Sequence, residues 1–156
     1  GMGRLFDGVA AILGIKRRCS YEGQGAVLLE AAASADDGVY NYTLDGAPLR
    51  FDWRDMIRSI VTDMNRGDDV GAIAARFMNT LIDMATRQCG AARSETGLDS
   101  VVLSGGTFQN MYLMRRLPER LREAGFTVYH HSRVSTNDEG ISLGQLMVAQ
   151  HQLERK

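Results

Sequence analysis

The 156-residue sequence predicts an α/β fold in which helices flank a short sheet that contains a parallel pair of strands. The first observation is the apolar run 101–103, which breaks at Gly105 and Gly106 and then leads into a helical pattern. A short run of branched residues is typical of a buried parallel strand. The second observation is the run 126–130, which follows that helix. Strand, crossover helix and strand together predict a parallel βαβ unit.

Composition restricts the function to a local site on one unit that spans residues 1–156. Hydrophobic residues make up 44% of the chain, which is enough for a core and excludes a disordered chain. The 18 basic and 19 acidic residues give a formal charge of −1. The chain as a whole therefore has no field that would gather nucleic acid or hold it on a membrane surface.

Cysteine usage and hydropathy predict a cytoplasmic protein without a membrane segment. Cys19 and Cys89 lie far apart and form no CxxC pair, which favours reduced thiols over a disulfide framework or a zinc site. No apolar run reaches the roughly 20 residues of a membrane span. The start of the chain, Gly1 to Arg4, lacks the apolar core of a signal peptide.

The first part of the chain predicts two helices and a hairpin. Apolar residues recur at helical spacing over residues 4–13, and Gly14 stands where a C-terminal cap belongs. Alanine and leucine favour a second helix over residues 26–33. Residues 39–44 alternate as a strand does, and Asp45-Gly46 is a tight-turn pair before residues 48–51, so we expect a β-hairpin.

Two further helices follow the hairpin. Asp52 is a suitable N-cap for a helix whose apolar stripe runs over residues 53–64. A second stripe repeats every three or four residues over residues 70–90 and predicts a longer helix. We expect residues 91–97 to form a polar loop that leads into the strand 100–103.

The last part of the chain completes the parallel unit and adds a helix. A helix begins near Gln109, and Pro118 removes one amide donor that could divide it into two pieces. Gly125 ends that helix before the second strand. A polar turn over residues 135–140 then opens a final helix over residues 141–150. Both polar turns follow parallel strands, and ligands of open α/β sheets bind at that edge.

The glycine pair has two possible roles. Free N–H groups and the dipole of the following helix favour an anion such as a nucleotide phosphate, but paired glycines can also simply turn a corner. Ser104 precedes the pair without a G-x-S-x-G motif or an assignable base, which argues against a hydrolase triad. His130 and His131 are neighbours on a strand and point to opposite faces, so they cannot bind one metal ion together.

Three other positions have a chemical and a structural interpretation. Asn137 and Asp138 carry hard oxygen ligands suited to Mg²⁺, Mn²⁺ or iron, whereas Asp138 could instead cap the last helix. Asp7 could accept ribose hydroxyls or lie on an exposed helix face. Gly23 permits close backbone approach at a helix start or is a common loop glycine.

Four blocks together carry a family resemblance. They are GRLFD (residues 3–7), YEGQ (21–24), SGGTFQN (104–110) and NDEGISLGQ (137–145). In this order they resemble the C-terminal region of the hydrogenase-maturation carbamoyltransferase HypF and, more distantly, the tRNA threonylcarbamoyltransferase TsaD. The resemblance implies the C-terminal lobe of an actin-like ATPase, ribonuclease H-like fold, as the C-terminal half of a TsaD-like carbamoyltransferase domain.

The resemblance also implies a reaction. HypF-like proteins use carbamoyl phosphate and ATP to form carbamoyl adenylate, and they pass the carbamoyl group to the C-terminal cysteine of HypE, a partner protein. The group becomes a cyanide ligand on the iron of [NiFe] hydrogenase. A divalent metal, Mg²⁺ or iron, accompanies the nucleotide. The alternatives are a TsaD-like lobe acting on tRNA and a non-catalytic module that only docks a partner.

By this resemblance the nucleotide-binding residues are Asp7, Gly23, Gly105, Gly106 and Asn110, and the metal ligand is Asp138. No catalytic nucleophile is implied, because positioning and charge stabilisation can carry the transfer. Two positions depart from the family pattern: Glu139 replaces a glycine, and Met78 stands where Phe-His is common. The paired-histidine metal motif of the first half of the domain is missing, so we expect the chain alone to be inactive.

Overall fold

The computed structural model describes residues 1–46 and 49–154. In chain order its elements are α1 (Met2–Ile12), α2 (Gln24–Ala32), β1 (Thr43–Asp45), β2 (Arg50–Asp52), α3 (Arg54–Arg66), α4 (Val70–Thr96), β3 (Ser100–Leu103), η1 (Gly106–Gln109), α5 (Met111–Glu123), β4 (Thr127–His130), η2 (Asp138–Gly140) and α6 (Ile141–Glu154), where η denotes a 3₁₀-helix. All the predicted helices are present. The α/β class is confirmed.

Two small sheets hold the strands. β1 pairs with β2 in an antiparallel hairpin, and β3 pairs with β4 in parallel, with Leu103 opposite His130. The parallel βαβ unit is therefore confirmed, with α5 as its crossover helix. One face of the β3–β4 pair packs on the core through Leu103, while Val102 and Tyr129 are exposed on the other face.

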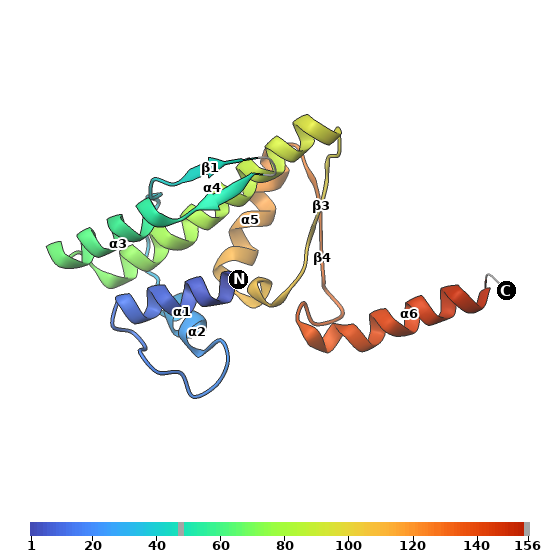
Figure 1. Ribbon diagram of the computed structural model, residues 1–156, viewed down its shortest axis with the longest axis horizontal. Helices are drawn as coiled ribbons and strands as arrows, with labels where there is room; N and C mark the ends of the chain where they lie inside the picture. Colours follow the sequence, from blue (N-terminus) through green and yellow to red (C-terminus); the bar gives the residue numbers. More distant parts are fainter. Residues whose placement is uncertain (47–48, 155–156) are drawn as a thin grey trace.

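Helix α4 is the centre of the core. It packs against α2, α3 and α5, and Figure 1 shows it as the long helix beside α3. Phe77 of α4 is fully buried and meets Phe6 of α1 edge to face, with ring centroids 5.0 Å apart. This contact links the core to α1, because aromatic pairs of this geometry add to the burial of their apolar area.

Several details of the predicted helices differ in the structure. The loop expected over residues 91–97 is helical to Thr96, because Arg93 lies over the Phe126 ring at 4.1 Å and donates to the Ala124 carbonyl, which stabilises the last turns of α4. Pro118 lies inside one continuous α5, where it is buried between Leu117 and Leu121. The N-cap of α3 is Trp53 rather than Asp52, whose carboxylate accepts from the Arg54 amide two residues later.

The strand predicted over residues 39–44 begins only at Thr43. Tyr40 is buried, and its amide donates to the Thr80 hydroxyl of α4 at 2.9 Å, so this backbone is used by a helix rather than by a neighbouring strand. The Tyr40 hydroxyl donates to Asp63 at 2.8 Å. The pKa of Tyr40 is raised well above its usual range, mainly by burial and in second place by this hydrogen bond to Asp63. The predicted second strand includes Pro48, which lies outside the described residues.

An ionic network links the segment that precedes the β1–β2 hairpin to α3 and α4. Arg76 bonds to the carboxylates of Asp36, Asp63 and Asp68, and Arg66 bonds to Asp63 and Asp68. Hydrogen bonding from Arg66, reinforced by its charge and by Arg76, holds the pKa of Asp68 at about 2. Asp68 thus supports the fold in its ionised form.

We expect the variant Asp68→Asn to weaken the dependence of stability on acid pH. Asp68 titrates near pH 3.9 when unfolded and at about 2 when folded, so its contribution is present above about pH 4 and is lost as the pH falls through 2. The difference in melting temperature between the parent protein and the variant should therefore shrink as the pH falls from 5 to 2. Asp37→Asn, at an exposed position, is the control. A difference in melting temperature that stays constant with pH would contradict a stabilising role of ionised Asp68.

Helix α6 extends away from the other helices (Figure 1) and has no buried residue. Its large apolar side chains are well exposed, for example Leu146 at 67% and Leu153 at 73%. Exposed apolar surface of this extent is typical of an element that packs against another unit. Within residues 1–46 and 49–154, no helix has the length and apolar character required to cross a bilayer.

Candidate functional site

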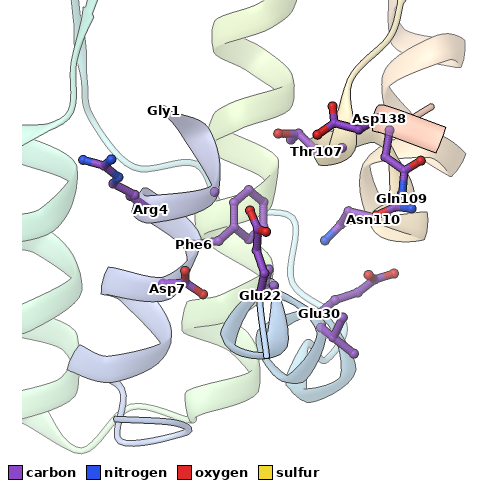
Figure 2. Close-up of a pocket in the computed structure, with 16 residues that line it drawn as sticks. Gly1, Arg4, Phe6, Asp7, Glu22, Glu30, Thr107, Gln109, Asn110 and Asp138 are labelled. Carbon is purple, nitrogen blue, oxygen red and sulfur yellow. The ribbon is translucent and has the colours of Figure 1, made fainter. Parts of the chain in front are cut away.

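A cleft of about 660 Å³ lies between α1, the start of α2, η1 and η2. Figure 2 shows acidic and amide side chains reaching it from these separate elements. Its lining residues are Gly1, Gly3, Arg4, Phe6, Asp7, Glu22, Gly23, Ala26, Val27, Glu30, Gly106, Thr107, Gln109, Asn110, Asn137 and Asp138. The fold therefore gathers segments more than a hundred residues apart in the sequence at one place.

Five of the six residues singled out by the resemblance line this cleft: Asp7, Gly23, Gly106, Asn110 and Asp138. The sixth, Gly105, is adjacent, and its amide donates to the Thr136 carbonyl at 2.9 Å. This bond ties the glycine turn to the loop that carries Asp138. The structure thus brings the predicted residues together, while their binding roles remain predictions.

The glycines of the cleft differ in why the fold accepts them. Gly23 and Gly105 have φ angles of +81° and +105°, a backbone conformation that side chains with a Cβ rarely adopt. Gly106 has no such angle, and a Cβ added there would meet nothing within 4 Å. Because nothing in the described chain requires a glycine at position 106, the open space beside it is available to a ligand.

Asp7 has an unsatisfied acceptor. Its Oδ1 is buried and has no hydrogen-bond partner among the described residues. Gly25 of α2 makes room for this oxygen, because a Cβ there would lie 2.6 Å from it. A buried carboxylate oxygen without a donor is costly, so a site of this kind is typical of one that a ligand's hydroxyl or amine completes.

The first amides of α5 already have acceptors within the protein, which weighs against the interpretation of this helix start as an anion site. Oε1 of Glu30 accepts from the amides of Met111 and Tyr112, and Oδ1 of Asn110 accepts from Leu113. The helix therefore receives its negative charge from the protein itself. Among the described residues, the amide nitrogen of Asn110 has only a weak acceptor, the sulfur of Met78 at 3.7 Å, and is able to donate to a ligand.

Asn137, rather than Asp138, is the N-cap of η2, the short 3₁₀-helix that precedes α6. Oδ1 of Asn137 accepts from the Glu139 amide at 3.1 Å and from the Ser135 hydroxyl at 2.6 Å. The structural interpretation of Asp138 as the cap is therefore wrong. The Asp138 carboxylate is exposed at the cleft and makes no hydrogen bond with any described residue.

The charges around the cleft suit a cation-bound ligand. Among the described residues that line it, Asp7, Glu22, Glu30 and Asp138 are acidic and Arg4 alone is basic. A polyphosphate would meet repulsion here unless a divalent cation accompanied it. In the described ranges, no group of three or more His, Cys, Asp or Glu residues is placed to hold a metal ion. The exposed carboxylate of Asp138 is of the hard oxygen type that divalent metals prefer.

Sequence reasoning missed a histidine partner for Ser104. Oγ of Ser104 lies 3.0 Å from Nε2 of His131, and both residues are exposed just beyond the paired ends of β3 and β4. Only the register of the parallel strands reveals this pair, since 26 residues separate its members. Neither residue is part of the cleft lining, so the pair joins two turns rather than completing the cleft.

Comparisons with known proteins agree on one group. The sequence model described as "Carbamoyltransferase, Kae1-like Domain, second subdomain" matches residues 1–145. Carbamoyltransferase HypF of Synechocystis sp. is 34% identical over 150 residues, which cover 94% of this chain and 19% of that protein. A tRNA N6-adenosine threonylcarbamoyltransferase of Methylobacillus flagellatus is 26% identical over 160 residues, which cover 96% of this chain and 46% of that protein.

A solved structure also matches nearly the whole chain. It is a crystal structure of full-length HypF in the phosphate- and nucleotide-bound form, 41% identical, with a TM-score of 0.93 over 99% of this chain and 21% of that chain. The chain therefore spans about a fifth of the length of the Synechocystis HypF and of this full-length HypF structure. The cleft residues all lie within the matched region.

Proposed function

The chain belongs to the HypF carbamoyltransferase family, as a Kae1-like second subdomain, and we propose that it forms one wall of a nucleotide cleft in a HypF-type enzyme. The predicted resemblance to HypF is confirmed, and the matched family model describes the chain as a Kae1-like second subdomain. The observation that carries the proposal is the convergence of Asp7, Gly23, Gly106, Asn110 and Asp138 on one cleft. The nucleotide held by the similar full-length HypF structure supports this choice of ligand.

In the proposed reaction, water releases phosphate from carbamoyl phosphate, and the resulting carbamate displaces pyrophosphate from ATP to give carbamoyl adenylate. The C-terminal cysteine thiol of a HypE-type acceptor then takes the carbamoyl group and releases AMP. The unsatisfied Oδ1 of Asp7 accepts a ribose hydroxyl, and the backbone at Gly23 lies against the nucleoside. The backbone of Gly105 and Gly106 and the amide of Asn110 contact the rest of the nucleotide. These contacts bind and orient the donor, which makes the transfer effectively intramolecular.

Asp138 would hold the divalent metal, Mg²⁺ or iron, together with ligands from elsewhere in the protein. When bound, such a metal supplies positive charge and Lewis acidity for phosphate or carbamoyl oxygens. The exposed carboxylate of Asp138 and the surplus of acidic groups around the cleft support this assignment. None of the cleft residues serves as a nucleophile, since the acceptor's thiol provides one.

The second wall of the cleft would come from another part of the protein. The fully exposed α6 and the short coverage of the HypF relatives support this proposal. We therefore expect the 156-residue chain alone to bind nucleotide weakly or not at all and to have no turnover.

A transfer to tRNA is the second candidate, because a tRNA threonylcarbamoyltransferase is 26% identical over 160 residues. Against it stand the formal charge of −1 and the YEGQ block at residues 21–24. The charge gives no general attraction for a polyanion.

Acceptor choice by the full-length protein tests the proposal. Given carbamoyl phosphate and ATP, we expect label on the C-terminal cysteine of a HypE-type protein and none on a control acceptor that ends in alanine. In a parallel reaction, tRNA and threonylcarbamoyl adenylate should give no modified tRNA. Modification of tRNA with no label on the cysteine would overturn the proposal in favour of the second candidate.

A further inference from the structure

Glu30 joins two helices at the cleft. It lies on α2, and its Oε1 accepts from the amides of Met111 at 2.8 Å and Tyr112 at 3.1 Å, the first two residues of α5. Its side chain also lines the cleft, as Figure 2 shows. The family resemblance assigned no role to this residue. Its contacts span 81 and 82 positions of sequence, so they fix tertiary structure rather than a local turn.

The geometry of this bridge places two proposed nucleotide contacts relative to each other. Gly23 is the N-cap of α2, and Asn110 is the N-cap of α5. The first amides of a helix have no partner within it, so a negatively charged acceptor stabilises that end by direct bonds and through the helix dipole. Glu30 supplies this acceptor from α2 and so holds the start of α5 against the helix that carries Gly23.

We propose that Glu30 is a positioning residue for nucleotide binding, which it promotes by holding Asn110 in place. This inference rests on the proposed nucleotide cleft. Oδ1 of Asn110 accepts from the Leu113 amide, and within the part of the chain that the structure describes its Nδ2 meets only the Met78 sulfur, at 3.7 Å. The direction in which Nδ2 donates is therefore set by the backbone of residues 110–113, and Glu30 bonds to the two amides in the middle of that segment.

ATP titration of the full-length protein by calorimetry tests this role. We expect Glu30→Ala to weaken ATP affinity about tenfold, with the far-ultraviolet circular dichroism spectrum unchanged. Glu30→Gln should recover most of the affinity, because its amide oxygen can still accept from both amides. Glu119→Ala, which removes an exposed glutamate of α5 away from the cleft, is the matched control and should leave the affinity unchanged.

A double-mutant cycle with Asn110→Ala separates positioning from general stabilisation. If Glu30 acts through Asn110, Glu30→Ala should cause little further loss of affinity once Asn110 is alanine. If Glu30→Ala does not fold, the same cycle with Glu30→Asp keeps the test valid, because the shorter side chain keeps the charge but loses the reach to the amides of Met111 and Tyr112. Additive losses, or an unchanged affinity in Glu30→Ala, overturn the positioning role. A parent protein that binds no ATP contradicts the proposed function itself.

Discussion

Replacing Phe77 with alanine should lower the free energy of unfolding by about 4 kcal/mol, because the change leaves a cavity at the centre of the core. Phe77 is fully buried and meets Phe6 edge to face at 5.0 Å. Phe6 in turn lines the cleft, so the loss of its partner also loosens α1, which carries Asp7. Core packing and the shape of the site are thus connected through a single aromatic pair.

Urea unfolding followed by circular dichroism measures this loss. Leu98→Ala is the control, since Leu98 is 69% exposed and its truncation should change stability by less than about 0.5 kcal/mol. A loss below about 1 kcal/mol for Phe77→Ala would show that α1 and α4 do not share a tightly packed core.

The helices and the parallel strands could be predicted because their patterns are local. The apolar stripes of α3 and of most of α4 recur at helical spacing, and the apolar run before Gly105 is visible in the sequence itself. The last turns of α4 have no such pattern, because they depend on the contact of Arg93 with Phe126. Residues 39–42 alternate as a strand does, but burial of Tyr40 against α4 determines their conformation.

The composition of the site could be predicted only in part. The family blocks pointed to Asp7, Gly23 and Asn110, and the fold brings them to one cleft. Glu30 had no local signal, since its partners lie on another helix. The same holds for His131, whose partner Ser104 is set by strand register. Contacts between distant segments cannot be inferred from spacing along one chain.

Spacing also could not decide between the metal and cap interpretations of Asp138. Asn137 and Asp138 are adjacent, and either side chain suits a helix start. The structure gives the cap to Asn137 and leaves the Asp138 carboxylate facing the cleft. A role in metal binding is therefore proposed for Asp138, and its removal should affect chemistry more than folding.

The variant Asp138→Asn in the full-length protein tests the central claim most directly. The substitution keeps the size of the side chain but removes the charge, and Glu139→Gln makes the same change at an exposed neighbour outside the cleft lining. We expect Asp138→Asn to lower the rate of carbamoyl transfer to the HypE-type cysteine at least about a hundredfold. Asp138→Asn should also lower the amount of bound metal, measured by atomic emission, and should leave the melting temperature nearly unchanged. Glu139→Gln should have little effect on the transfer rate or on the metal content. Transfer and metal content equal to those of the parent protein would contradict a nucleotide and metal site in this cleft.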